Sequence, residues 1–296
     1  MKNLKEFIKQ ILSEESLSIY GFTTPFIPER DKNFLINWIR KKYHADMKWM
    51  EKTLDKRIDV KKVFKSVRSV LVVAVPYKKI DTGKYKIASY ALHVDYHKFI
   101  YKKLKRVMGR VKDKFNDIEY KIYVDTGPLL ERMFARRAGL GFIGKNTMLI
   151  SFKKGSYVLL GIVLLNKDIE PDEEIEKNFC GKCKRCIEAC PTGAIIEPFT
   201  IDSNKCISYH TIENRGEIPE EIKKKMGGWI FGCDVCQEVC PWNKNPIEPS
   251  DFPMHPYVKN FDIEDFRKNP DRYLKDSPLK RAKKEGILRN IDKNKV

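Results

Sequence analysis

Apolar residues recur at helical spacing at the start of the chain. In the stretch MKNLKEFIKQIL they are Leu4, Phe7, Ile8, Ile11 and Leu12, with charged residues between them. This period predicts an amphipathic helix. A signal peptide would need an unbroken apolar core here, and the longest apolar runs elsewhere are strand-sized and far short of a membrane span. We therefore expect a cytoplasmic protein with no membrane partner.

The pattern up to about Leu165 alternates between strands and helices. Arg68–Tyr77 predicts a buried strand, and Glu119–Asp125 alternates like a strand that ends at a Thr-Gly-Pro turn. Asp95–Phe115 predicts a long amphipathic helix. Its expected inward residues are Ile100, Leu104, Val107, Met108 and Val111, and its outward residues are Lys98, Lys102, Lys105, Arg106 and Lys112.

The following segments complete an α/β unit and suggest where it ends. Leu129–Gly139 predicts a helix with a glycine stop, and Thr147–Phe152 with Ser156–Leu165 predicts a hairpin around residues 153–155. An acidic stretch containing Pro171 is a plausible boundary. We expect a catalytic α/β domain over 1–168, a cysteine-rich domain over 169–250, and a basic segment over 251–296 that follows a proline-rich link and packs on the core.

The charge balance indicates an anionic partner. The chain has 58 Lys and Arg residues against 40 Asp and Glu residues, a net charge of +18. A thermophile's bias would raise Glu together with Lys, which is not the case here. Nucleic acid is the favoured partner, and a solvated basic surface or a membrane surface are the alternatives. No signature of a known RNA-binding module is present.

All eight cysteines lie between Cys180 and Cys240. The spacing Cys-x2-Cys-x3-Cys-Pro occurs at Cys183–Pro191 and again at Cys233–Pro241, which is typical of two-cluster ferredoxins. In such proteins the cysteine before each proline binds the other cluster. One [4Fe–4S] cluster is then expected on Cys180, Cys183, Cys186 and Cys240, and the other on Cys190, Cys206, Cys233 and Cys236. A pair of structural zinc sites is the alternative, but zinc ribbons do not require this repeat.

A glycine-rich stretch, GLGFIGKN, matches the dinucleotide fingerprint and nearly matches a phosphate loop. Its context disfavours both interpretations, because it follows a helix and leads into a strand, and because Asn146 replaces the magnesium-binding hydroxyl. The glycines would allow close approach of a flat cofactor, with Lys145 beside an anionic group. A plain helix-capping turn is the alternative.

Asp125 is the strongest candidate for a general acid. It ends a mostly apolar strand, and a carboxyl group in an apolar pocket keeps its proton to higher pH. The alternative is a cap for the helix Leu129–Gly139. The five histidines are scattered, and Asp95-Tyr96-His97 begins like a cobalt-ligand motif but has Ile100 where that motif has glycine. No histidine ligand to cobalt is therefore expected.

Several motifs together resemble those of the epoxyqueuosine reductases. They are VDTGPLLER, AGLGFIGKNTMLI, CGKCKRCIEACPTGA, CISYHTIENRGEIP, FGCDVCQEVCPWN and SPLKRAKKEGILRN, in that order, and the resemblance runs from about Arg57 to Asn290. The chain is similar to a short form without the C-terminal helical-repeat extension. His93 and His210 stand where the family usually has Gly and Leu.

The resemblance implies a fold and a reaction. The fold is a cobalamin-binding α/β domain, similar to nitroreductases and reductive dehalogenases, joined to a two-[4Fe–4S] ferredoxin-like domain. The reaction is reduction of epoxyqueuosine to queuosine at the wobble position of tRNAs with GUN anticodons. An external low-potential donor would supply electrons through the clusters to base-off cobalamin. A monomer is expected.

The resemblance also assigns roles to residues. Asp125 would be the catalytic acid beside the cobalamin. Further cobalamin contacts would be Arg57, Lys145, Ser208, Cys233 and Asp234, and Arg215 would contact tRNA. Two rival functions fit the sequence less well. A reductive dehalogenase would usually carry an export signal and leave the +18 charge without a role. A non-catalytic ferredoxin-type carrier would not need the first 165 residues.

Overall fold

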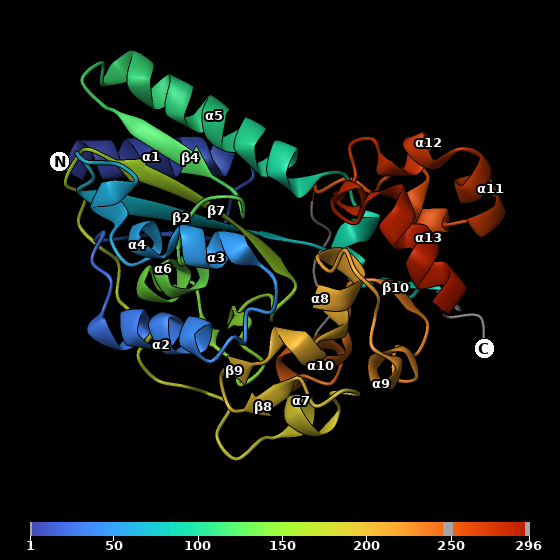
Figure 1. The fold of residues 1–296 in the computed structure, drawn as a ribbon. Coiled ribbons are helices and arrows are strands. Elements are labelled where there is room, and N and C mark those ends of the chain that lie inside the picture. Colours follow the sequence, from blue (N-terminus) through green and yellow to red (C-terminus); the bar gives the residue numbers. More distant parts are fainter. Residues whose placement is uncertain (1, 84, 245–250, 294–296) are drawn as a thin grey trace.

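A four-stranded sheet forms the centre of the first half of the molecule in the computed structural model, which describes residues 2–83, 85–244 and 251–293 (Figure 1). The strand order is β1 (Tyr20–Thr23), β2 (Ser69–Pro76), β7 (Val158–Leu165), β4 (Tyr120–Tyr123), and all neighbours are antiparallel. The predicted strands 68–77 and 119–125 are confirmed, with β4 shorter than expected. The mixed α/β class is confirmed as well.

Helices cover both faces of this sheet, which explains why β2 is apolar throughout. Leu71, Val73 and Val75 pack with α1 (Lys2–Glu14) and α5 (Tyr96–Lys114) on one face. Val70 and Val72 pack with α6 (Glu131–Arg137) on the other face. Side chains of a strand alternate between faces, so a strand covered on both sides must be apolar at every position.

Helix α5 folds as its sequence predicts. Its five predicted inward residues are fully buried, and the side chain of Asp95 caps its first turn by accepting from the N–H of His97. A Cβ at Gly161 of β7 would lie 2.7 Å from Ile100 and 2.9 Å from Leu104, so this glycine allows α5 to pack closely on the sheet. The N-terminus of α5 is thereby fixed relative to β4.

The chain turns around residues 153–155 as expected, with Ser151 and Gly155 forming an antiparallel bridge, but the expected pairing of 147–152 with 156–165 is wrong. Strand β6 (Leu149–Ile150) pairs with β5 (Phe142–Ile143), whereas β7 pairs with β2 and β4. The glycine-rich stretch supplies the partner strand, because Gly141 lies so close to Ile150 that a Cβ would come within 2.1 Å of its carbonyl oxygen. Gly139 follows α6 with a φ of +76°, as a helix-capping turn requires.

The remaining elements are short. They are α2 (Glu29–Arg40), α3 (Lys48–Lys52), α4 (Leu54–Arg57), β3 (Lys86–Ile87), α7 (Arg185–Glu188), β8 (Ile195–Glu197), β9 (Thr200–Ile201), α8 (Ile207–Ile212), α9 (Glu220–Lys223), β10 (Trp229–Phe231), α10 (Val235–Glu238), α11 (Ile263–Lys268), α12 (Pro270–Leu274) and α13 (Lys283–Lys293). Within the described ranges, no helix is long and apolar enough to span a membrane.

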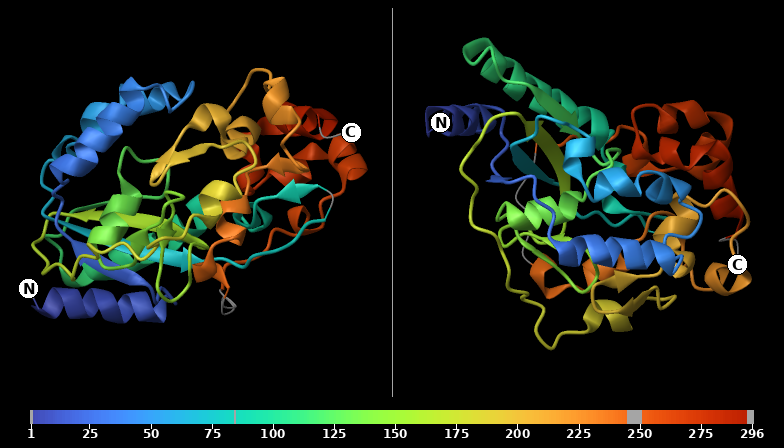
Figure 2. Two further views of the ribbon diagram at one scale, coloured as in Figure 1. Left: turned by 90° about the horizontal axis from the view of Figure 1, so that it is seen from below. Right: turned by 60° about the vertical axis from the view of Figure 1, so that its left-hand side comes forward.

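A further hydrophobic core joins segments that are far apart in the sequence. Ile87 and Leu92 pack there with Phe231 of β10 and with Phe266 and Ile287 of the C-terminal helices, and β3 pairs with β10. This core lies at the opposite end of the molecule from α1 (Figure 2). The three-domain division stays a prediction, since this packing crosses its boundaries and the boundary at 250 falls outside the described residues.

Candidate active site

Asp125 lies just beyond the end of β4 in a conformation that is unusual for its residue type. Its φ is +60°, in the left-handed region that residues other than glycine seldom adopt. Such backbone strain tends to occur at functional sites. The side chain is 63% exposed, so its carboxylate is accessible from solvent.

The Asp125 carboxylate is held by two neighbouring residues of the α5 N-terminus. The Tyr96 hydroxyl donates a 2.7 Å hydrogen bond to Oδ2, and Nε2 of His97 lies 3.4 Å from the same oxygen. The rings of Tyr96 and His97 stack with their centroids 4.0 Å apart. These contacts supply two potential proton donors to one carboxylate oxygen.

A second carboxylate supports His97 from the other side. Nδ1 of His97 lies 2.7 Å from Oδ1 of Asp95, which is almost completely buried. The ammonium of Lys280, from the C-terminal segment, donates to Oδ2 of Asp95. The imidazole is thus held between two carboxylates, and the C-terminal segment contributes to holding it.

These contacts decide which group carries the proton. Burial lowers the pKa of His97, but the bonds to Asp125 and Asp95 outweigh it and raise the pKa to about 9. Loss of hydration raises the pKa of Asp125, but bonds from His97 and Tyr96 outweigh it and hold that pKa below its ordinary value. The expected apolar pocket is therefore wrong. At neutral pH Asp125 is ionised and His97 carries the proton.

The alternative role of Asp125 as a helix cap is wrong. Helix α6 begins after Leu130 with no side-chain cap. Instead of the Asp125 side chain accepting from the backbone of α6, the backbone N–H of Asp125 donates a 2.8 Å hydrogen bond to Oε1 of Glu131 in α6. Burial and the nearby Asp125 charge raise the pKa of Glu131 to about 8. Glu131 is therefore protonated at neutral pH beside the ionised Asp125.

The structure brings one predicted cobalamin contact, Arg57, close to Asp125. Its guanidinium bonds to the Thr53 hydroxyl at 3.0 Å, and Glu131 and Asp125 both act on its charge. A partly buried tyrosine, Tyr90, lies between this region and the second cysteine repeat. Its ring contacts the Tyr96 ring edge-on with centroids 5.9 Å apart, and it packs on the same hydrophobic cluster as Cys233.

The structure gathers the first predicted set of cysteines. The pKa of Cys186 is raised by burial and then by the thiols of Cys180, Cys240 and Cys183. Burial also raises the pKa of Cys240, and Cys180 and Cys183 add to it. Cys240 joins this set because α7 and α10, the helices of the two repeats, pack against each other.

The second predicted set is gathered in the same way and lies deeper. Burial raises the pKa of Cys233 to about 12, with Cys206 and Cys190 among its neighbours. Burial raises the pKa of Cys236 well above its ordinary value, and Cys233, Cys206 and Cys190 add to it. Across the described residues, no three Cys, His, Asp or Glu side chains are gathered closely enough for a single metal ion. That each set binds a cluster stays a prediction.

The other predicted contacts lie apart from Asp125. Lys145 belongs to the first cysteine set, because its ammonium donates to the carbonyls of Gly181 and Cys183 and its N–H lies 3.4 Å from the Cys180 sulfur. Ser208 lies in the first turn of α8, where its N–H acts on the thiol of Cys206. A cobalamin contact by Lys145 therefore has no support from this arrangement.

Asp234 and Arg215 already have structural partners. The carboxylate of Asp234 accepts from the Ser89 N–H at 2.7 Å and from the Gln237 amide at 3.0 Å, and it is only 2% exposed. Arg215 is exposed and donates to the carbonyls of Ile212 and Arg281. This links the end of α8 to the C-terminal segment and leaves part of the guanidinium accessible.

The two histidines that depart from the family pattern are buried and hydrogen-bonded. His93 bonds to the Ser89 carbonyl and stacks on Phe252 with centroids 4.6 Å apart. His210 bonds to the Asn204 carbonyl at 2.7 Å. Burial lowers the pKa of both side chains, so both are neutral packing groups.

The sequence-based candidates omitted Tyr96, His97 and Glu131. The tyrosine and histidine were considered only as part of a metal-ligand motif, and Glu131 stood in VDTGPLLER without a role. A usable signal was present. Asp95, Tyr96 and His97 are consecutive residues at the start of a predicted helix, and each can form hydrogen bonds through its side chain.

Comparisons with known proteins agree with this geometry. Residues 57–126 match the family model described as epoxyqueuosine reductase QueG, DUF1730, and residues 179–243 match the 4Fe-4S double cluster binding domain. An epoxyqueuosine reductase from Leadbetterella byssophila is 38% identical over 98% of both chains. The match to the double-cluster model agrees with the cysteine repeat and not with a pair of zinc sites.

Two solved structures extend the agreement to the fold. A crystal structure of selenomethionine-labelled epoxyqueuosine reductase has a TM-score of 0.87 at 29% identity, covering 99% of this chain and 81% of that one. A structure of epoxyqueuosine reductase with an epoxyqueuosine-modified tRNA-Tyr stem loop has a TM-score of 0.80 at 28% identity, covering 99% and 82%. The chain therefore belongs to the epoxyqueuosine reductase family.

Proposed function

We propose that this chain reduces epoxyqueuosine to queuosine at the wobble position of tRNA anticodons. The observation that carries the proposal is an accessible carboxylate, Asp125, bonded to Tyr96 and close to a protonated His97. Tyr90 lies beside Tyr96 and packs on the same hydrophobic cluster as Cys233 of the second cysteine set. Such a site could support several reductions, and the family relationship indicates epoxyqueuosine as the substrate.

The cysteines present fit two [4Fe–4S] clusters. Each set provides the four thiols that one cluster needs. N–H groups already lie near the sulfurs, from Lys145 to Cys180 at 3.4 Å and from Ala194 to Cys190 at 3.2 Å. Such hydrogen bonds to sulfur raise the potential of a bound cluster. Electrons would enter through the accessible first set and continue to the deeper second set.

Cobalamin fits between the second cysteine set and Asp125. Arg57 on the acid side, and Ser208 and the Cys233–Asp234 segment on the cysteine side, are the residues that would hold it, with no histidine ligand expected. When bound, cobalamin supplies a low-potential metal centre that collects the two electrons which clusters deliver singly. The chain's own residues supply the protons.

The proton chemistry follows from the hydrogen bonds. Conversion of the epoxide to the alkene consumes two electrons and two protons, and the oxygen leaves as water. Because Asp125 is ionised, His97 first passes its proton to Asp125 across their 3.4 Å contact, and Asp125 donates it to the leaving oxygen. His97 then takes up a proton from solvent, and this second proton follows the same route and completes the water. Tyr96 fixes the orientation of the carboxylate. The acid is therefore a pair, with the proton stored on the imidazole.

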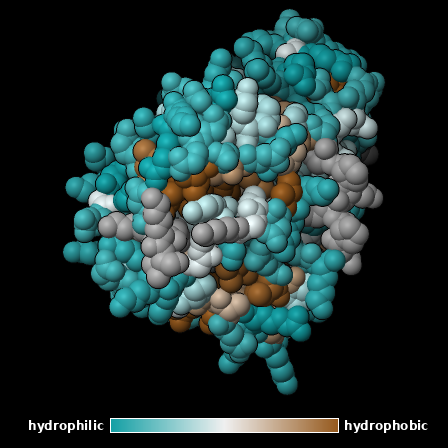
Figure 3. Space-filling view, turned by 90° about the vertical axis from the view of Figure 1, so that its right-hand side faces the viewer, coloured by the Kyte–Doolittle hydropathy of each residue, from teal (hydrophilic) through white to brown (hydrophobic). Residues whose placement is uncertain are grey.

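The substrate is a large polyanion, and the charge of the chain suits it. The net charge of +18 supports binding of tRNA phosphates, with Arg215, the outward face of α5 and the basic C-terminal segment as contacts. The face around the C-terminal helices is mostly hydrophilic, with hydrophobic residues gathered in hollows near its centre (Figure 3). We further propose a cytoplasmic monomer that acts on tRNAs with GUN anticodons and receives electrons from an external low-potential donor.

One assay tests this function directly. Purified protein, reconstituted with iron, sulfide and cobalamin, is given a reductant and an epoxyqueuosine-containing anticodon stem loop, and the nucleosides are separated by mass. We expect queuosine, which has one oxygen fewer. Unchanged substrate with fully loaded protein would refute the proposal, and protein without cobalamin is the matched control.

A further inference from the structure

A cluster of four aromatic rings lies beside the first cysteine set. The rings belong to Phe142, Phe152, Phe179 and Trp242, with neighbouring centroids 5.1 to 6.3 Å apart. Phe179 immediately precedes Cys180, and Trp242 follows the Cys240–Pro241 pair. Both cysteines belong to the same set, so the aromatic cluster covers the outer side of that set.

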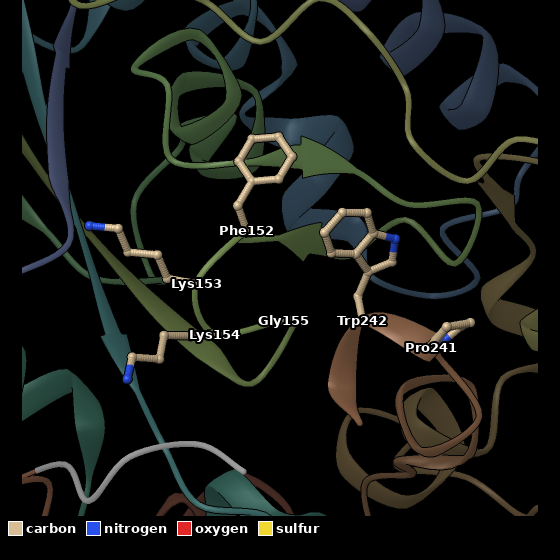
Figure 4. A pocket seen from close by; sticks show the side chains of 6 residues that line it. All are labelled: Phe152, Lys153, Lys154, Gly155, Pro241 and Trp242. Atoms are coloured by element: carbon tan, nitrogen blue, oxygen red, sulfur yellow. The ribbon is translucent and has the colours of Figure 1, made fainter. Parts of the chain in front are cut away.

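Part of this cluster is open to solvent. Phe152 is 43% exposed and Phe179 is 39% exposed. Figure 4 shows the rings of Phe152 and Trp242 next to each other at a surface hollow, while the Lys153 and Lys154 side chains project away from them. Adjacent exposed aromatic residues of this kind often mark an interaction surface.

Basic residues lie next to the aromatic residues along the chain. Residues 177–187 contain Lys177, Lys182, Lys184 and Arg185 but no Asp or Glu, and Lys153 follows Phe152 directly. The Lys177 ammonium lies 5.6 Å from the centre of the Phe179 ring. A partner that fits this surface must therefore be acidic around an apolar centre.

The position of the surface indicates what the partner does. The first cysteine set is the nearer to solvent, because residues 181, 182, 184 and 185 between its cysteines are exposed, whereas Asp234 and Gln237 beside Cys233 and Cys236 are buried. Electrons must reach the second set and the Asp125 region from outside. The aromatic surface lies next to this first set, since two of its rings adjoin cluster cysteines in the sequence.

We propose that the surface formed by Phe152, Phe179 and Trp242, with Lys153 and Lys177 at its edge, is the docking site for a small acidic one-electron carrier protein. The carrier loses one electron, and the cluster on Cys180, Cys183, Cys186 and Cys240 gains it, with no bond or proton exchanged. This inference rests on the proposed function, because it requires the clusters to be part of an electron path.

A kinetic experiment on the reconstituted full chain tests the docking site. A reduced acidic plant-type [2Fe–2S] ferredoxin is the probe, and cluster absorbance is followed by stopped flow without cobalamin or tRNA. In K153E/K177E, we expect the second-order rate constant at low salt to fall at least about tenfold. Raising the salt should shrink the difference, because screening weakens the attraction of the wild type.

Two controls decide the interpretation. K61E/K65E changes the charge equally at two exposed lysines outside the aromatic surface and should keep the wild-type rate, and dithionite should reduce all three proteins equally. A wild-type rate in K153E/K177E, or an equal loss in K61E/K65E, would overturn the proposal. The proposal would also be overturned if K153E/K177E lost tRNA affinity and kept the wild-type rate of cluster reduction. It would be overturned as well if the wild type were a dimer that Phe152→Ser converts to a monomer without changing that rate. Failure of the proposed function would leave this cluster reduction unaffected.

A separate observation concerns the phenol of Tyr157, at the start of β7. The residue is 1% exposed, and its hydroxyl has no hydrogen-bond partner among the residues that the structure describes. Buried hydroxyls nearly always have a partner. The preceding residue, Ser156, donates a 2.9 Å hydrogen bond to Gln237, which directly follows Cys236 of the second set. The charges that act on the phenol are those of Asp234 and Glu238 and then of Cys236 and of Cys240 of the first set. An unpaired donor therefore lies near both sets.

We infer that the Tyr157 hydroxyl donates a hydrogen bond to a sulfur of a bound iron–sulfur cluster. Hydrogen bonds to cluster sulfurs raise the reduction potential, because they stabilise the extra negative charge of the reduced state. In Tyr157→Phe we expect the one-electron reduction equilibrium constant of one cluster to fall by about tenfold, which is 59 mV.

Potentiometric titration followed by electron paramagnetic resonance measures this shift without any turnover. Tyr77→Phe is the matched control, since its ring packs against Tyr157 with centroids 5.5 Å apart. Unchanged potentials of both clusters in Tyr157→Phe would overturn the inference, as would an equal shift in Tyr77→Phe.

Discussion

The hydroxyl of Tyr96 donates a 2.7 Å hydrogen bond to Oδ2 of Asp125, although α5 and β4 separate the two residues in the chain. Packing of α5 on the sheet places its N-terminus beside the end of β4. The same packing brings His97 within 3.4 Å of the carboxylate. The acid, its orienting hydroxyl and its proton store are therefore assembled by one helix–sheet contact.

Replacement of Asp125 by asparagine should remove the acid and keep the shape of the site. Because general-acid catalysis typically contributes about 10²–10⁴-fold, we expect turnover to fall by that factor. The measurement is single-turnover conversion of the stem loop by fully loaded protein. Retention of more than about a tenth of wild-type turnover would contradict the role, provided that cluster and cobalamin spectra match the wild type.

The pH dependence should follow His97. Its pKa is raised to about 9, so the imidazole carries its proton below that pH and loses it above. Turnover should therefore fall as pH rises through about 9. In His97→Gln the proton store is gone, and the fall should begin at lower pH with a reduced maximum rate. Identical profiles for the two proteins would exclude His97 as the proton store.

The raised pKa of His97 should also stabilise the folded protein at low pH, and this stabilisation should be lost at high pH. The folded protein holds the His97 proton more tightly than the unfolded chain, whose histidine has a pKa of about 6.5. This stabilisation is fully present below about pH 6.5 and is lost as pH rises through about 9. Chemical unfolding at pH 6 and pH 10, compared between wild type and His97→Gln, measures it.

Lys280 should matter for stability through Asp95. Its ammonium donates to a carboxylate that is almost fully buried, although the lysine side chain itself is 47% exposed. Because Lys280→Met removes one of the partners of Asp95, we expect a loss of about 1 kcal/mol in the free energy of unfolding. The control Lys284→Met, at an exposed site, should change it by less than about 0.5 kcal/mol.

The pH dependence of that loss identifies its origin. The bonds from His97 and Lys280 outweigh burial and hold the pKa of Asp95 below its ordinary value. The stabilisation is therefore present above about pH 4 and disappears as pH falls through the lowered pKa. The difference between Lys280→Met and wild type should shrink in strong acid. A constant difference down to low pH would indicate lost packing instead of a lost ion pair.

The cysteine pairing gives a test with double variants. Cys180→Ala and Cys240→Ala remove ligands from the same set, so either change alone, or both together, should lower bound iron by roughly half. Cys180→Ala combined with Cys206→Ala removes ligands from both sets and should abolish most iron binding. Iron and sulfide analysis with electron paramagnetic resonance checks this. Equal losses in the two double variants would show that the sets are assigned wrongly.

The sequence predicts correctly those parts of the molecule whose structure follows from a pattern along the chain itself. The buried face of α5 follows from its period, and the cysteine sets follow from a duplicated spacing. The β5–β6 pairing was missed because glycines at 139 and 141 weaken strand propensity, while close backbone packing requires them. The polar surroundings of Asp125 were missed because Tyr96 and His97 reach it only through the tertiary packing of α5.

Binding of tRNA should depend steeply on salt, and α5 should account for part of that dependence. Lys102 and Lys105 lie on its exposed face, and in the described part of the chain neither has an ion-pair partner. Each phosphate contact contributes a slope of roughly 0.7–0.9 log units of affinity per log unit of salt. In K102Q/K105Q we therefore expect the slope to decrease by about 1.5, measured by fluorescence anisotropy with a labelled anticodon stem loop.

K153Q/K177Q removes the same charge from the aromatic surface and should keep the wild-type slope. An unchanged slope in K102Q/K105Q would exclude α5 from the tRNA interface, and an affinity independent of salt in the wild type would exclude phosphate contacts altogether.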